Sequence, residues 1–174
     1  MSHKVLVAYA SRTGSTAGVA EVIGKKIQQG GAQVDVRAME TICDLKPYTA
    51  VVAGSAIRSS QWLPEAMQFV RDHRMALNQK PFAAFLVCMT LTIGNGKYRQ
   101  QVRSFLDPVR TLVKPVSEGY FAGVLDISKV PRLKDRLLFR LSVTLGVWSQ
   151  GDHRDWDAIQ AWAESLLPLL QLKE

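Results

Sequence analysis

The segment that most constrains the fold is residues 5–16, Val-Leu-Val-Ala-Tyr-Ala-Ser-Arg-Thr-Gly-Ser-Thr. Its apolar first half predicts a buried strand. The next six residues carry four hydroxyl side chains and one glycine, and a stretch with amphipathic helical spacing follows. A strand, a small polar loop and a helix together favour phosphate binding, because the helix start offers unpaired N–H groups and a positive dipole end. Ser and Thr are equally favoured as helix caps, so the loop alone fits both interpretations.

The loop over 11–16 differs from the two common phosphate motifs. It lacks the Gly-Lys-Ser/Thr ending of a nucleoside-triphosphatase loop and the three spaced glycines of a dinucleotide fingerprint. Hydroxyl groups without a lysine suit a monophosphate that is held without a metal. The three histidines are scattered and show no metal-ligand spacing, so we expect no metal site.

Strand and helix patterns alternate along most of the chain. Apolar runs predict strands, and apolar residues three and four apart predict helices. In the third predicted helix, Pro108 should cause a kink or a break. The predicted strands are 5–10, 33–39, 50–55, 81–89 and 119–125, and the predicted helices are 15–29, 64–77, 97–113 and 155–170. This order predicts an α/β fold with a five-stranded parallel sheet and helices on both faces. Ligands bind beyond the carboxyl ends of such strands, where loops 11–16, 55–62 and 89–98 should converge.

Residues 129–148 depart from this alternation. Apolar residues repeat there at helical spacing, and the same stretch carries five basic residues against Asp135 alone. The apolar residues are Leu133, Leu137, Leu141, Leu145 and Trp148, and the basic residues are Lys129, Arg132, Lys134, Arg136 and Arg140. We expect an extra basic amphipathic helix near 131–148. It either contacts an anionic membrane surface or packs on the domain with a solvated basic face.

Composition narrows the class of protein. With 174 residues and 47% hydrophobic residues, we expect a single globular domain over 1–174. The net charge of +7 favours an anionic partner, but basic residues are not interleaved with stacking aromatics, so we expect no nucleic acid. Cys43 and Cys88 lie far apart, and no apolar run is long enough to span a membrane, which favours the cytoplasm.

Four segments resemble the flavodoxin family. The loop at 11–16 resembles its FMN phosphate signature, and residues 53–58 (Ala-Gly-Ser-Ala-Ile-Arg) and 88–91 (Cys-Met-Thr-Leu) are similar to its second and third flavin loops. Residues 151–156 (Gly-Asp-His-Arg-Asp-Trp) resemble the entry to its last helix. The resemblance implies a flavodoxin-like, doubly wound sheet and FMN as the cofactor.

The resemblance also implies a role for each loop. The phosphate contacts fall on Ser11, Thr13, Gly14, Ser15 and Thr16, and Arg12 either adds charge there or points to solvent. The flavin ring would lie between one group formed by Ser55, Ala56 and Ile57 and another formed by Cys88, Met89, Thr90, Leu91 and Gly94. Arg58 either contacts the flavin or a carboxylate substrate, or is a solvated loop arginine.

Within that family the chain is most similar to the menaquinone-dependent protoporphyrinogen oxidase branch. The similar features are residues 54–58, the basic helix after the fifth strand and the Arg-Asp-Trp at 154–156, whereas the loop after Leu91 is shorter here. This branch implies oxidation of protoporphyrinogen IX to protoporphyrin IX in heme biosynthesis. The electrons would pass to a membrane quinone, and the protein would contact the inner face of the cytoplasmic membrane peripherally. The alternative is a flavodoxin-type electron carrier between proteins, but such carriers are usually acidic around the flavin.

Overall fold

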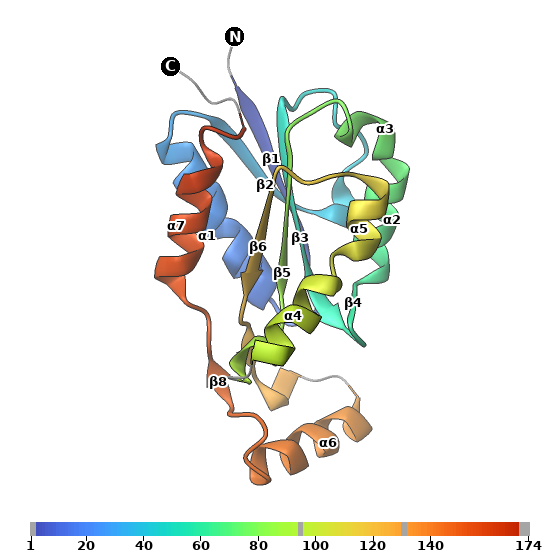
Figure 1. The fold of residues 1–174 in the computed structure, drawn as a ribbon, viewed down its shortest axis with the longest axis vertical. Helices are drawn as coiled ribbons and strands as arrows, with labels where there is room; N and C mark the ends of the chain where they lie inside the picture. The colour runs from blue at the N-terminus through green and yellow to red at the C-terminus, as the bar shows by residue number, and fades with distance from the viewer. Residues whose placement is uncertain (1–2, 94–95, 130–131, 171–174) are drawn as a thin grey trace.

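The computed structural model describes residues 3–93, 96–129 and 132–170 and contains the predicted five-stranded parallel sheet (Figure 1). The strand order is β2-β1-β3-β5-β6, and each neighbouring pair in this path is parallel. The strands are β1 (Lys4–Ala10), β2 (Gln33–Ala38), β3 (Ala50–Arg58), β5 (Phe82–Val87) and β6 (Ser117–Phe121). The predicted fold class is therefore confirmed.

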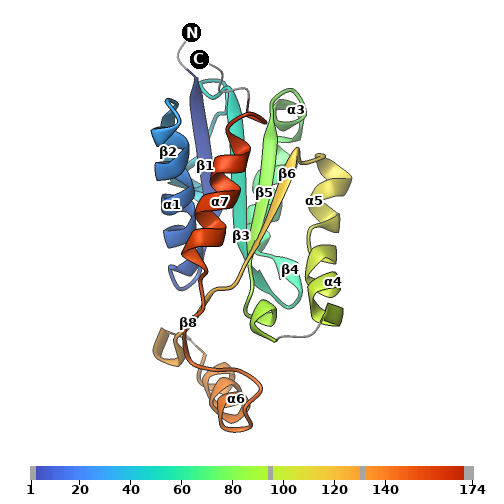
Figure 2. The same ribbon diagram turned by 60° about the vertical axis from the view of Figure 1, so that its left-hand side comes forward.

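Helices cover both faces of this sheet, as predicted (Figure 2). One face carries α1 (Ser15–Gln29) and α7 (Trp156–Leu166). The opposite face carries α2 (Pro64–Asp72), α3 (Arg74–Leu77), α4 (Gly96–Ser104) and α5 (Asp107–Leu112). The helix expected over 97–113 is split into α4 and α5, with Pro108 in the first turn of α5. Single 3₁₀ turns are η1 (Met39–Thr41), η2 (Met89–Thr92) and η3 (Ile127–Lys129).

The alternating side chains of β1 explain why the central strands are apolar throughout. Leu6 and Ala8 belong to the core layer under α2 and α5, whereas Val5 and Val7 belong to the layer under α1 and α7. All four are fully buried. A parallel strand that is covered on both faces needs apolar residues on both sides, which produces the continuous hydrophobic run of the sequence.

The loop expected over 55–62 is instead a β-hairpin. Strand β3 continues to Arg58 and pairs with the antiparallel strand β4 (Gln61–Trp62). Ser59 and Ser60 form the turn with φ of 50° and 61°, the conformation of a tight two-residue hairpin. The sequence did not indicate this turn, because it lacks the Asn-Gly or Asp-Gly pair that usually marks one.

The last predicted strand is also interrupted. The pair Val124–Leu125 (β7) leaves the sheet and pairs antiparallel with Gly151–Asp152 (β8). This two-stranded stem carries η3 and α6 (Leu133–Thr144), which lie beyond the carboxyl end of the sheet (Figures 1 and 2).

The basic helix expected near 131–148 is present as α6, although residue 131 lies outside the described residues. All of α6 is described and none of its residues is buried, so the helix adds no side chain to the two core layers of the domain. Leu133, Leu137, Leu141 and Leu145 are 58–70% exposed. Within the described part of the chain, no helix has the length and hydropathy needed to cross a bilayer.

Gly54 provides a test of the sheet packing. It lies on β3 opposite Phe85 of β5, and a Cβ atom at this position would overlap the Phe85 ring. We expect Gly54→Ala to lower the free energy of unfolding by about 1–3 kcal/mol, because the buried ring has to shift. Chemical denaturation measures the change. Gly96→Ala is the control, because its Cβ meets nothing within 4 Å, and equal stability of the two variants would contradict the packing argument.

Candidate functional site

The loop between β1 and α1 leaves the start of the helix open. Gly14 is the N-cap residue with φ of 89°, in the left-handed region that favours glycine, and it has no side chain that could cap α1. Its own N–H donates to Ser11 Oγ over 3.1 Å. Among the described residues, no side chain caps the N–H groups of the first turn. These groups are therefore free for an anion, and the helix-cap interpretation of the loop does not account for them.

Thr16 adds a second unpaired donor at the same place. Its side chain is fully buried, and its Oγ1 has no hydrogen-bond partner among the described residues. A buried hydroxyl without a partner costs about 1–3 kcal/mol. An acceptor oxygen placed at the start of α1 would remove that cost, so the residues present fit a bound phosphate group.

Arg12 has most of its charge compensated within the protein. Its two terminal nitrogens lie 2.7 and 2.9 Å from the two carboxylate oxygens of Glu65. This bidentate pair ties the loop to the first turn of α2, a role that neither of the two expectations for Arg12 included.

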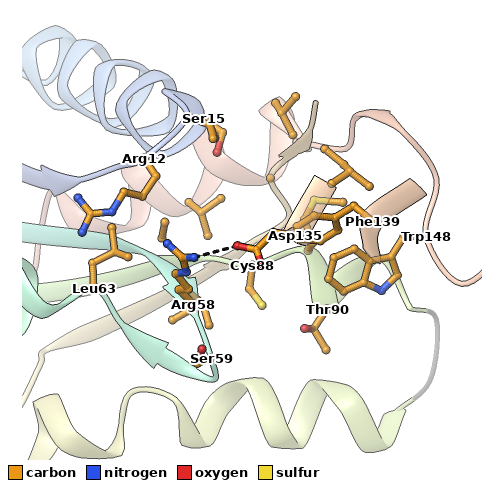
Figure 3. Close-up of a pocket in the computed structure, with 18 of the residues that line it drawn as sticks. Arg12, Ser15, Arg58, Ser59, Leu63, Cys88, Thr90, Asp135, Phe139 and Trp148 are labelled. Atoms are coloured by element: carbon orange, nitrogen blue, oxygen red, sulfur yellow. Dashed lines mark hydrogen bonds and ion pairs between the residues drawn. The ribbon is translucent and has the colours of Figure 1, made fainter. Parts of the chain in front are cut away.

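A cavity of about 740 Å³ opens where the strands end (Figure 3). Its volume is typical of small-molecule sites. The structure brings together all three loops that the sequence singled out. The predicted site residues that line the cavity are Arg12, Thr13, Ser15, Ala56, Ile57, Arg58, Cys88, Met89 and Thr90.

The remaining predicted residues do not line this cavity. Ser11 and Gly14 shape the loop, as described above, and Thr16 is buried. Leu91 lies in η2, packs against the core and lines a separate pocket of about 370 Å³. Gly94 lies outside the described residues.

Ser55 is buried and its hydroxyl is used within the fold. It accepts a hydrogen bond from the Leu63 N–H over 3.0 Å and donates to the Ala56 carbonyl over 2.8 Å. The bond from Leu63 connects β3 to the N-cap of α2, and the bond to Ala56 lies within β3. Ser55 therefore holds the hairpin that places Ala56, Ile57 and Arg58 in the cavity wall.

One wall of the cavity comes from a segment to which the sequence analysis assigned no site residue. It includes Arg132, Asp135, Leu138, Phe139 and Trp148. The Phe139 and Trp148 rings lie 5.3 Å apart and are both half-buried. The available signal was position, because this segment leaves the fifth strand at the same edge of the sheet as the other loops.

An ion pair joins this wall to the hairpin. Arg58 Nη2 donates to Asp135 Oδ2 over 3.1 Å, across the cavity from the end of β3 to the first turn of α6 (Figure 3). The side chains are 47% and 38% exposed. Pairs this exposed contribute little to stability, typically about 0–1 kcal/mol.

Among the described residues, the cavity contains neither a thiolate nor a metal-binding cluster. Burial raises the pKa of the Cys88 thiol, so the side chain is protonated at neutral pH. Trp62 is buried in the core and does not line the cavity. Within the described ranges no cluster of His, Cys, Asp or Glu could hold a metal ion. A site of this kind can hold a cofactor that performs the chemistry.

Comparisons with known proteins agree with this geometry. Residues 6–153 match the family described as flavodoxin domain. The chain is 24% identical to the protoporphyrinogen IX dehydrogenase (quinone) of Escherichia coli strain K12, over 95% of this chain and 96% of that protein.

Two solved flavodoxin structures share the fold across nearly their whole length. A short-chain flavodoxin associated with a bacterial microcompartment has a TM-score of 0.62 and 14% identity, covering 95% of this chain and 97% of that one. A flavodoxin from Streptococcus pneumoniae has a TM-score of 0.59 and 17% identity, covering 95% and 98%. The family match spans most of the described sheet and the cavity at its edge. The chain therefore belongs to the flavodoxin domain family.

Proposed function

We propose that residues 1–174 form one FMN-binding domain of an oxidoreductase, with the phosphate held at the start of α1. The observation that carries this proposal is the pair of unused donors at one end of the cavity. They are the uncapped N–H groups of α1 and the buried Thr16 hydroxyl. Thr13 and Ser15 line the cavity beside them and add two further hydroxyls.

The rest of the cavity suits a flat, largely apolar ring. Ala56 and Ile57 lie in one wall, Met89 and Thr90 lie in another, and the protonated Cys88 adds no charge. When bound, FMN supplies the electron-transfer chemistry. The residues of the chain position the ring and limit the access of water to it, and the wall formed by α6 contributes to this shielding.

We further propose that the electron donor is protoporphyrinogen IX, which is oxidised to protoporphyrin IX in heme biosynthesis, and that the acceptor is a membrane quinone. The 24% identity to the Escherichia coli dehydrogenase over nearly both chains supports this substrate. The net charge of +7 and Arg58 in the cavity wall suit a substrate with carboxylates.

An electron carrier is the second candidate, and the fold similarity to flavodoxins favours it. The position of α6 favours the enzyme instead. A carrier exchanges electrons at a surface that its protein partner can reach, whereas here Phe139 and Trp148 wall the cavity. Such a wall is more useful around a small substrate.

The exposed face of α6 supports the membrane part of the proposal. Five leucines between residues 132 and 145 are exposed, and the basic residues Arg132, Lys134 and Arg140 lie in the same segment. An apolar stripe flanked by positive charge binds the surface of an anionic bilayer. Such contact, at the inner face of the cytoplasmic membrane, would place the cavity near dissolved quinone.

Thr16→Val tests the cofactor site, because we expect it to weaken FMN binding and to stabilise the protein without FMN. We expect FMN to bind the wild-type protein and to bind the variant about 5- to 100-fold more weakly, because a hydrogen bond to the phosphate is lost. The protein without FMN should gain stability, because valine removes an unpaired buried hydroxyl. Titration with FMN and chemical denaturation measure the two effects. Thr111→Val on α5 is the control, and unchanged FMN affinity in Thr16→Val would contradict the phosphate site.

Turnover distinguishes the enzyme from the carrier. We expect the FMN-loaded protein to convert protoporphyrinogen IX to fluorescent protoporphyrin IX when a menaquinone analogue is supplied under nitrogen, and a sample without protein gives the background. Failure of this reaction, together with rapid electron exchange with a protein partner, would reject the enzyme and support the carrier.

The membrane contact is tested on α6 with Leu137→Gln combined with Leu141→Gln. Both side chains are 58% exposed, so the fold should not change. We expect binding to phosphatidylglycerol vesicles in a sedimentation assay to fall at least about tenfold, because two leucines no longer enter the bilayer. Met75→Gln, at a side chain 78% exposed on α3, is the matched control. Equal vesicle binding by the two variants would reject this role of α6.

A further inference from the structure

The arginines that line the cavity differ in how fully they are paired. Arg12 makes two hydrogen bonds to Glu65. Arg58 makes a single one, to Asp135, among the residues that the structure describes. Arg132 lines the same cavity, and its guanidinium has no ion-pair or hydrogen-bond partner within the described ranges. Arg58 and Arg132 thus line one cavity from the hairpin and from the start of α6, and both keep hydrogen-bond donors that the described residues do not use.

Arg110 and Arg154, like Arg12, show how strongly an arginine of this fold can be held by a carboxylate. Arg110 pairs with both carboxylate oxygens of Glu118 and also contacts Asp107, and Arg154 binds both oxygens of Asp152. A bidentate pair is the geometry in which an arginine holds a carboxylate most strongly. Arg58 lacks this geometry with Asp135, so the pair in the structure is replaceable.

Asp135 can release Arg58 at little cost. It occupies the first turn of α6, where the positive end of the helix dipole stabilises a carboxylate. Arg132 and Lys134 neighbour it in sequence and keep the local charge positive. When a ligand carboxylate displaces the Asp135 side chain from Arg58, one ion pair is therefore exchanged for a similar one. Any contact of the ligand with Arg132 then adds to its affinity.

We propose that Arg58 and Arg132 form a recognition site for two carboxylates of the substrate, and that Asp135 occupies Arg58 until a substrate carboxylate replaces it. This inference rests on the proposed function, because protoporphyrinogen IX supplies the two carboxylates. The ligand class is a dicarboxylate with an apolar ring, and the uncharged quinone acceptor does not use this site. Binding also separates the hairpin from α6, because the Arg58–Asp135 pair connects them.

The experiment compares protoporphyrin IX with its dimethyl ester as ligands of the FMN-loaded protein, by quenching of tryptophan fluorescence in detergent. Trp148 lines the cavity and reports binding without turnover. We expect the diacid to bind at least about tenfold more tightly than the ester. Arg58→Gln and Arg132→Gln should each reduce this preference severalfold, and Lys134→Gln, which removes a positive charge from α6 outside the cavity, should leave it unchanged.

Asp135→Asn distinguishes a recognition site for substrate carboxylates from an ion pair that only holds α6 in place. We expect tighter binding of the diacid, because the internal competitor is gone, and unchanged binding of the ester. If the pair served only to hold α6, then Asp135→Asn and Arg58→Gln would change binding of both ligands in the same direction, and this result would overturn the inference. Equal binding of diacid and ester to the wild-type protein would also overturn it but leave the proposed function standing. If neither ligand binds, the porphyrin substrate itself is rejected.

Discussion

The parallel pairing of β1, β3 and β5 is the constraint on which the site depends. In this register Ala10 lies opposite Ser55, and Ala56 lies opposite Val87, so the three strands end at one edge. The residues that follow them are distant in the sequence but meet around one cavity. Apolar packing on both faces of the sheet fixes this register, because a slip of one residue would exchange the two core layers.

Two buried hydroxyl side chains at this edge have different hydrogen-bonding roles. Ser55 and Thr16 are both fully buried in the described part of the chain. The Ser55 hydroxyl is satisfied by the backbone and holds the hairpin, whereas Thr16 Oγ1 has no partner there. One hydroxyl therefore stabilises the wall of the site, and the other remains available for a ligand.

The sequence predicted the parts of this protein that depend on local patterns. The first four parallel strands and the positions of the main helices follow from apolar periodicity, and the break between α4 and α5 follows from Pro108. The hairpin at Ser59 and Ser60 could not be predicted, because its left-handed turn is built from residues that rarely adopt it. The orientation of α6 as a wall of the cavity could not be predicted either. It depends on a stem that is two residues long on each side, too short to produce a recognisable pattern.

The stem formed by β7 and β8 has an evolutionary consequence. Because the two strands are paired, the chain leaves and re-enters the domain at neighbouring points, and the described residues between them add no strand to the five-stranded sheet. Insertions, deletions or a wholly different helix between these points would leave the register of the five parallel strands untouched. Proteins built on the same core can therefore acquire new partners by exchanging this one segment while the three loops at the sheet edge stay the same.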